Sequence, residues 1–521
     1  PSSRTMSTAA APHAFVILRF SDKNRFGKNG VPALRPYSGG QRCVIRMKEA
    51  TLEKAGKRDR FAKVELEDGS MEGRLMELLG NVGEYPAELQ ACQLHFGIKP
   101  CRYPVAESWG LLPVAELGTD ARLDCTALAT VSIDNASTKD IDDALSFGFA
   151  VGADGSGDGS GKLATIGIHV ADVASRMACA SPLFRWAKER GGSAYHSGVP
   201  SEEAHGGPGG SVPMLPPALA HGELSLNQGV PRNAISLFLE IDEEGAVARR
   251  WHARSRIVND DATTYDAFDA DRTAAPPGSR ALLARLSGAT EADEMVAWCM
   301  IEYNAYFGRL LVEQAAVQGG AAGEGGEEGA CEASGLLRVQ PKEGGVASYA
   351  FSSGEQRRHS GLGIADYAHC SSPIRRYSDL HNQHMLFGSY AGGRGGVDGA
   401  PALKALNKRV AETAFYHAMV VAMELGYRCR DKPTIFRGKV EFSEDGRCLR
   451  VYTDKGRVKV PLTDSYFAEP LAKLFADSVH GDEMQVELCG VLKSGRTQLR
   501  VRVPTVAAVA LAPGGGGTGA P

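Results

Sequence analysis

Four aspartates lie within ten residues of one another in the stretch TVSIDNASTKDIDDALS, residues 130–146. They are Asp134, Asp140, Asp142 and Asp143. The residues on either side are apolar, with Val131 and Ile133 before the cluster and Ala144, Leu145 and Phe147 after it. Such flanks are typical of two strands that enter a core. Like charges held there repel one another strongly, so the cluster requires a counter-ion.

The spacing of the aspartates, D-x5-D-x-D-D, follows a predicted strand end and its loop, so the side chains can converge. Carboxylate oxygens select Mg²⁺, Mn²⁺ or Ca²⁺ over softer metals. The loop has no glycine, which disfavours a Ca²⁺ loop of the EF-hand type. We expect all four aspartates to hold one or two Mg²⁺ ions, with Mn²⁺ as a substitute. An acidic turn capped by backbone amides, or a structural Ca²⁺ site, is the alternative.

A second polar segment, YAHCSSPIRRYSDLHNQ, occupies residues 367–383. Arg375 and Arg376 follow a Ser-Pro pair, which favours the start of a helix, where free N–H groups attract anions. The guanidinium group also fits a phosphate with two hydrogen bonds. We expect both arginines to bind phosphate. The alternative is that each pairs with a nearby acid.

The length of 521 residues exceeds what one core holds, since domains have roughly 100–200 residues. No apolar run reaches about 18 residues, so we expect no membrane span. The eleven cysteines include no C-x-x-C pair, which favours a reducing compartment over a disulfide scaffold or zinc knuckle. The net charge of −4 does not indicate a nucleic-acid binder, but the segment 428–502 is rich in lysine and arginine.

The periodicity of apolar residues divides the chain into segments of predicted strands, helices and loops. Segments 40–85 and 434–503 each read as short strands of a small barrel, and the second has the five strands of an OB-type barrel. Residues 123–260 alternate strands with loops, whereas 290–315 and 405–428 are amphipathic helices. Gly-rich inserts at 152–161, 319–335 and 391–402 read as surface loops. The start of the chain has few acids, and an organelle transit peptide, a trimmed end and an added segment remain open.

Five motifs in this order resemble a known family: SIDNASTKDIDDALS at 132–146, GIHVADV at 167–173, PMLP at 213–216, AISLFLEID at 234–242 and SPIRRYSDL at 372–380. They are similar to the catalytic RNB domain of the ribonuclease II/R exoribonucleases. The resemblance implies an α+β fold, a mixed RNB catalytic domain at 120–430 flanked by cold-shock-like and S1-like barrels. We therefore expect a flexible segment at 1–35, an S1/OB-like barrel at 431–505 and a disordered tail at 506–521. Residues 36–119 are expected to form a cold-shock/OB-like barrel, and the length before residue 120 leaves room for only part of a second barrel.

The resemblance also implies a function: Mg²⁺-dependent hydrolytic 3′→5′ digestion of single-stranded RNA to nucleoside 5′-monophosphates. Carried over by position, Asp134, Asp140, Asp142 and Asp143 hold metal and water, and Arg375 contacts the scissile phosphate. Tyr195 matches a tyrosine that stacks on the terminal base, with a buried tyrosine at a turn as its alternative. Glu412 resembles an acid near the RNA 3′ end.

Other residues of the motifs and their surroundings are expected to be structural. His169 and Asp172 belong to a motif strand, and a histidine among apolar neighbours on a strand is more often a core group than a ligand. Trp186, Trp251, Phe307 and Tyr306 are expected in the core, although one aromatic should clamp a terminal base.

Two functions compete with an active RNA exonuclease. One is a catalytically inactive RNB-family RNA-binding regulator, in which metal-site acids are expected to be lost. The other is a nuclease of the same chemistry that acts on DNA or on a nucleotide. We expect an intracellular monomer, and the sequence leaves open the cytoplasm, an organelle and membership of a larger RNA-decay complex.

Overall fold

The computed structural model describes seventeen stretches of the chain: 13–22, 29–37, 42–49, 51–52, 57–66, 72–98, 103–112, 122–149, 163–179, 181–195, 211–321, 334–342, 346–387, 399–443, 446–453, 456–461 and 481–502. The predicted tail 506–521 and the insert 152–161 lie outside these residues. Helices and strands are mixed along the chain, so the predicted α+β class is confirmed. No helix among the described residues is both long and apolar enough to cross a membrane.

The N-terminal strands form a closed barrel in the order β1-β2-β3-β5-β4. Their bounds are β1 His13–Leu18, β2 Gly30–Leu34, β3 Arg42–Arg46, β4 Arg60–Leu66 and β5 Glu72–Asn81. The predicted flexible segment 1–35 is therefore wrong at β1 and β2. Strand β1 pairs with both β2 and β4 and buries Val16 and Leu18, so it closes the barrel. Its apolar run is short and surrounded by small residues, which concealed it in the sequence.

The central sheet has seven strands in the order β14-β7-β8-β9-β12-β13-β6. Their bounds are β6 Leu123–Asp124, β7 Thr130–Asp134, β8 Asp143–Phe149, β9 Leu163–Ala171, β12 Pro231–Ile241, β13 Val247–Val258 and β14 Asp261–Thr264. The pairs β8–β9 and β12–β13 are antiparallel hairpins, as their alternating sequences predicted. Strands β7 and β8 also pair antiparallel, and this brings the two ends of the aspartate segment together.

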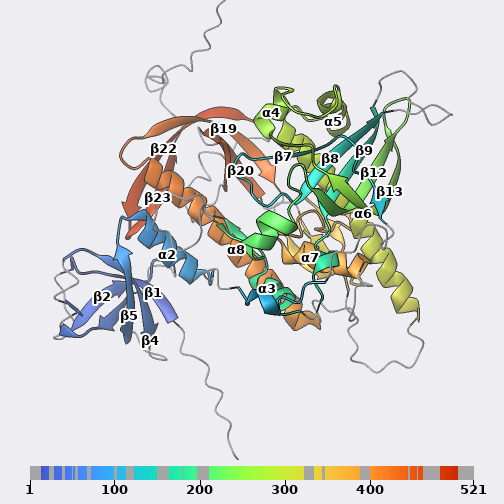
Figure 1. The fold of residues 1–521 in the computed structure, drawn as a ribbon. Helices are drawn as coiled ribbons and strands as arrows, with labels where there is room; N and C mark the ends of the chain where they lie inside the picture. Colours follow the sequence, from blue (N-terminus) through green and yellow to red (C-terminus); the bar gives the residue numbers. More distant parts are fainter. Residues whose placement is uncertain are drawn as a thin grey trace, which may run out of the picture.

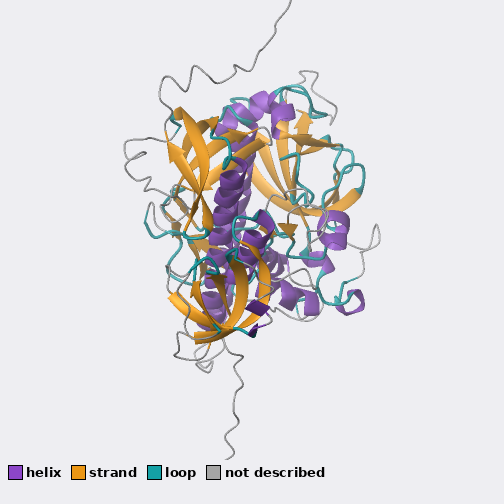
Figure 2. Ribbon diagram, turned by 90° about the vertical axis from the view of Figure 1, so that its left-hand side faces the viewer, coloured by secondary structure: helices purple, strands orange, loops and turns teal. Residues whose placement is uncertain are grey.

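Two long helices organise the rest of the molecule. Helix α6, Ala292–Ala321, buries Cys299, Tyr303 and Phe307 in the core beneath the central sheet. Helix α8, Gly399–Arg428, runs from α3 to the C-terminal strands (Figure 1), and the helices gather in a column between strands (Figure 2). Both helices extend into segments predicted as loops, since α6 ends at Ala321 and α8 begins at Gly399.

Shorter elements connect these parts. The helices are α2 Tyr85–His95, η1 Ala106–Ser108, η2 Ala174–Arg176, α3 Pro182–Arg190, η3 Ala218–Glu223, α4 Tyr265–Asp269, α5 Ser279–Ser287 and α7 Tyr377–Phe387. The strands are β10 Ala194–Tyr195, β11 Ser211–Val212, β15 Leu336–Val339, β16 Ser348–Phe351, β17 Arg358–His359 and β18 Ile364–Ala365.

The C-terminal sheet has the predicted five strands, in the order β21-β20-β19-β22-β23. They are β19 Thr434–Ser443, β20 Gly446–Thr453, β21 Gly456–Pro461, β22 Glu483–Lys493 and β23 Arg496–Arg502, inside the segment expected for the S1-like barrel. An ion-pair cluster joins this sheet to the start of α6. The buried Arg450 contacts Asp293 at 2.8 Å and Glu291 at 3.1 Å. The sheet is thus fixed to the central domain by charge as well as by its packing on α8.

Helix α6 also fixes the chain that leads into the SPIRR motif. Asn304 on α6 accepts a hydrogen bond from the backbone N–H of Cys370 through its side-chain oxygen, at 2.8 Å. One turn later Gly308 lies so close to this chain that an added Cβ would be 1.8 Å from the Asp366 carbonyl oxygen. The helix can approach to this distance only because residue 308 has no side chain.

We predict that Gly308→Ala destabilises the protein, because the clash is with backbone, which cannot rotate away. Overpacking of this kind typically costs about 1–3 kcal/mol or more. Thermal unfolding of the full chain measures it. Gly222→Ala is the control, since no atom lies within 4 Å of its added Cβ. Equal melting temperatures for the two variants would contradict the close packing of α6.

Candidate active site

The four aspartates occupy a strand end, a loop and a strand start. Asp134 is the last residue of β7 and Asp143 is the first of β8, while Asp140 and Asp142 lie in the loop between them. The loop is held from a distant segment, because the Ile141 N–H donates to the Ser225 hydroxyl at 3.0 Å. Asp142 is also fixed through its backbone, whose carbonyl accepts from Ala171 N–H at 2.9 Å. Local strand pairing and long-range hydrogen bonds together orient the carboxylates.

Asp142 faces the SPIRR motif, which lies more than 200 residues further along the chain. One carboxylate oxygen accepts the Ile374 backbone N–H at 2.8 Å, and the other accepts Arg375 Nε at 3.0 Å. The Asp142 side chain is 2% exposed, whereas that of Arg375 is 41% exposed. Arg375 therefore neutralises a buried acid with one edge of its guanidinium group and still reaches solvent.

The turn that carries Arg375 is anchored by a second buried acid, Asp379, on the first turn of α7. Its carboxylate accepts hydrogen bonds from the Ser372 backbone N–H and from Arg376 Nη2, both at 2.8 Å. Arg376 also donates to the Ser371 hydroxyl at 3.3 Å. One guanidinium nitrogen of Arg376 is thus used by Asp379, and phosphate binding by Arg376 stays a prediction. Asp379 itself was missed, although its place in SPIRRYSDL could have identified it.

Tyr195 joins the site from β10. Its hydroxyl donates to the Asp140 carboxylate at 2.6 Å. Its backbone N–H donates to His417 Nε2 on α8 at 2.9 Å, and the two rings lie 5.8 Å apart. The sequence predicted Tyr195 at the site but gave no signal for His417, since a histidine on an amphipathic helix has no distinguishing pattern. The structure thus brings Tyr195, Asp140, Asp142 and Arg375 together.

Burial dominates the electrostatics of the acids. It raises the pKa of Asp134 from 3.8 to about 7, with further increases from Asp142 and Asp140, while Arg375 opposes them. Burial and the charge of Asp134 raise the pKa of Asp143 to about 7. For Asp142 burial raises the pKa to about 8 despite its contact with Arg375. One arginine is therefore too little positive charge for this cluster, and a cation beside it would be stabilised.

Among the described residues no three His, Cys, Asp or Glu side chains are placed to hold a metal ion together, and metal binding by all four aspartates stays a prediction. Asp142 contacts Arg375 and Asp140 contacts Tyr195. Within the described part of the chain, no hydrogen bond or ion pair occupies the carboxylates of Asp134 and Asp143. Two carboxylates with raised pKa values suit Mg²⁺, which in proteins is commonly held by one or two carboxylates, water and a substrate phosphate.

Glu412 lies on α8, and its carboxylate is 3.4 Å from Arg409 and 3.9 Å from Lys408 on the same helix. These are ion pairs of the helix surface. In the described part of the chain no hydrogen bond or ion pair joins Glu412 to the aspartates or to Arg375, and its role near an RNA end remains a prediction.

His169 and Asp172 are structural, as expected. His169 is fully buried between the hydroxyls of Ser146 and Ser236, and burial lowers its pKa to about 3. Asp172 pairs with Arg122 at 2.7 Å. Phe307 is in the core, and Trp251 stacks on the buried Phe238 with ring centres 4.3 Å apart.

Trp251, Trp186 and Tyr306 are only partly buried at the edges of the two core clusters. The histidine and the aspartate thus match their predictions, while these three aromatics were expected in the core.

The buried Asn259, for which the sequence predicted no role, connects two segments beside the site. Asn259 follows β13, and its side chain accepts the Ser132 backbone N–H at 3.2 Å and donates to the Leu226 carbonyl at 2.9 Å. It connects β7 to the segment that holds the aspartate loop. Only the fold reveals this role, because an asparagine after a strand usually marks a turn.

Comparison with known proteins agrees with this geometry. Residues 122–281 and 337–390 match the model of the RNB domain. Ribonuclease R of Chlamydia muridarum is 29% identical over 40% of this chain and 28% of its own length. DIS3-like exonuclease 2 of Caenorhabditis elegans is 31% identical over 36% of this chain and 21% of its own length. The matched region thus spans about a quarter of these relatives.

Solved structures share the fold over nearly the whole chain. RNase R of Mycoplasma genitalium in its apo form has a TM-score of 0.59 at 14% identity, covering 95% of this chain and 90% of that one. The yeast pseudonuclease Ssd1 has a TM-score of 0.59 at 13% identity, covering 95% and 83%. At such identities the likeness concerns the fold alone. Residues 122–281 and 337–390 are thus similar to an RNB domain, within a fold similar to that of RNase R.

Proposed function

We propose that this chain is a hydrolytic 3′→5′ exoribonuclease that shortens single-stranded RNA and releases nucleoside 5′-monophosphates. The observation that carries the proposal is the partly buried pair Asp134 and Asp143, whose pKa values are raised, beside the half-exposed Arg375. A site short of positive charge next to an accessible guanidinium group suits a phosphodiester and a divalent cation. The RNase R of Mycoplasma genitalium has been solved with single-stranded RNA, which supports RNA as the substrate class.

Each group has a distinct part in the proposed reaction. Asp134 and Asp143 would hold Mg²⁺, which when bound supplies an activated water and stabilises charge on the phosphate. Arg375, held through Nε by Asp142, presents its outer edge to a phosphate oxygen. Tyr195 is fixed by Asp140 and His417, so its ring has a defined position against a terminal base.

An inactive RNA-binding regulator is the competing function. Support for this function comes from Ssd1, a pseudonuclease whose fold is as similar to that of this chain as the fold of RNase R is. The fold therefore does not discriminate between the two functions. The four acids and Arg375, all present here, favour the enzyme.

We predict that Asp143→Asn lowers turnover about 100-fold or more while RNA affinity changes little, because the lost charge acts on the transition state. The assay follows shortening of a 5′-labelled RNA oligomer in Mg²⁺ and in EDTA, with free and blocked 3′ ends. Asp431→Asn, at a side chain 88% exposed, is the control. An unshortened RNA that still binds would identify the regulator instead, and a shortened DNA oligomer would widen the substrate class.

We predict that Arg375→Ala lowers both stability and turnover, because it leaves the buried Asp142 without its counter-ion. Breaking a buried pair costs up to about 3–5 kcal/mol. Adding Asp142→Asn should restore part of the melting temperature but none of the turnover. Arg249→Ala, in an exposed pair with Glu240, should change the free energy of unfolding by less than about 1 kcal/mol. If the double variant is no more stable than Arg375→Ala, the pairing has no energetic role.

We predict that the metal-free protein loses stability as the pH rises from 5 to 8. The folded pKa values of Asp134 and Asp143, about 7, and of Asp142, about 8, exceed the ordinary 3.8, so the folded state binds more protons in this range. Each group can then cost up to about 1.4 kcal/mol per pH unit. Melting curves in EDTA measure the loss, and Mg²⁺ should reverse it at pH 8.

The double variant Asp134→Asn/Asp143→Asn is the reference for this titration. It should melt above the wild type at pH 8 in EDTA and should not respond to Mg²⁺. A wild-type melting temperature that rises with pH in EDTA would show that the two acids are ionised without a metal.

A further inference from the structure

A hollow that is open to solvent lies behind the segment that carries Tyr195. Gly192 and Ala194 line it. Successive side chains of a strand point to opposite faces, so Ala194 faces the hollow while Tyr195 faces Asp140. Ser193 ties the same segment to the motif, because its N–H donates to the Arg375 carbonyl at 2.8 Å. One short segment thus separates the hollow from the acidic site.

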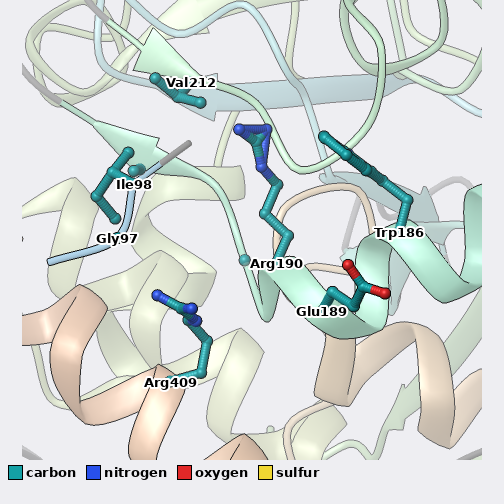
Figure 3. A pocket seen from close by; sticks show the side chains of 9 residues that line it. Gly97, Ile98, Trp186, Glu189, Arg190, Val212 and Arg409 are labelled. Atoms are coloured by element: carbon teal, nitrogen blue, oxygen red, sulfur yellow. The ribbon is translucent and has the colours of Figure 1, made fainter. Parts of the chain in front are cut away.

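Arg190, at the end of α3, enters the hollow between Ile98 and Trp186 (Figure 3). Its Nη1 donates to the Pro213 carbonyl at 2.9 Å. Its guanidinium carbon lies 5.3 Å from the Trp186 ring centre and 5.5 Å from that of Tyr103. These contacts fix a positive charge in one orientation before any ligand arrives.

Arg409 supplies a second guanidinium group from α8, 3.4 Å from the Glu412 carboxylate on the same helix. Its Nη1 donates to the Phe96 carbonyl at 3.0 Å. Two glycines in left-handed conformation make room for its side chain, Gly97 with φ +64° and Gly191 with φ +74°. An added Cβ would lie 2.7 Å from Arg409 Cγ at Gly191 and 3.3 Å from Nη1 at Gly97. The backbone is therefore shaped around this arginine.

The remaining wall is apolar and partly aromatic. Ile98, Val212 and Trp186 line it. Trp186 is only partly buried, yet its Nε1 is shielded from solvent and has no hydrogen-bond partner. An indole N–H in this state costs free energy that a ligand acceptor could recover. Glu189 is an acid of the lining and is exposed at the surface, so the lining has two positive charges and one negative.

We propose that this hollow is a second nucleotide site, separate from the aspartates, which binds a nucleoside 5′-phosphate group. The base packs on Trp186 and the apolar wall, and the phosphate lies between Arg190 and Arg409. A flat apolar part and an anion together match this pairing of an aromatic ring with two fixed guanidinium groups. The choice of a nucleotide rests on the proposed function. The ligand is either an upstream unit of the RNA strand or a released mononucleotide.

The test is calorimetric binding of adenosine 5′-monophosphate to the full chain in EDTA, where the aspartates have no metal with which to hold phosphate. We expect saturable binding that Trp186→Leu and Arg409→Gln each weaken about tenfold, the size of one lost stacking or phosphate contact. Adenosine and inorganic phosphate should each bind to the wild type at least about tenfold more weakly than adenosine 5′-monophosphate does. Lys404→Gln, at an exposed position on α8, and Asp143→Asn should bind like the wild type.

A 3′-blocked RNA oligomer identifies the source of the nucleotide. Displacement of the mononucleotide by RNA assigns the hollow to the strand, and simultaneous binding assigns it to free nucleotide. Melting curves of both variants show that they are folded. Absence of saturable binding to the wild type would overturn the proposal, and so would binding abolished by Asp143→Asn but kept in Trp186→Leu and Arg409→Gln. Neither result would affect the exonuclease assay, which reports on Asp143 alone.

Discussion

The contact between Asp142 and Arg375 is the interaction on which the site depends. It joins a loop of the central sheet to a turn more than 200 residues further along the chain, and it does so where Asp142 is almost fully buried. A buried carboxylate without a partner would have to take up a proton or move to solvent. Arg375 holds the loop of Asp142 against the SPIRR turn. Asp134 and Asp143 lie beside this loop with raised pKa values. The site is thus partly neutralised by the protein itself.

Adjacent arginines of one motif have different physical roles. Arg376 is bound to the buried Asp379 and holds the turn together, while Arg375 donates to Asp142 and to the Ser372 hydroxyl and stays partly exposed. The difference arises from the turn, which points consecutive side chains in different directions. Asn304 and the close approach of Gly308 fix that turn from α6. The position of the exposed guanidinium group is therefore determined by a helix that contributes no group to the site.

Helix α8 connects the C-terminal sheet to both faces of the segment 192–195. At one end it packs against the C-terminal sheet, and near the middle His417 holds the backbone of Tyr195. Further towards its start, Arg409 lines the hollow behind β10. The segment 192–195 is a thin wall with the acidic site on one face and this hollow on the other. A movement of α8 would displace residues on both faces of this wall, because both faces contact the helix.

Local patterns in the sequence determined much of this protein. Alternating apolar residues predicted the hairpins β8–β9 and β12–β13 and the five C-terminal strands, since a strand buries every second side chain. The motifs identified the aspartates and Arg375. Pairings between distant segments were decided by the tertiary structure alone: β1 closing the barrel, Asp379 holding Arg376, and His417 holding Tyr195. Whether an aspartate contacts an arginine or is left to bind a metal depends on which side chains the fold places within 3 Å of it. The spacing of residues along the chain carries no information about these distances.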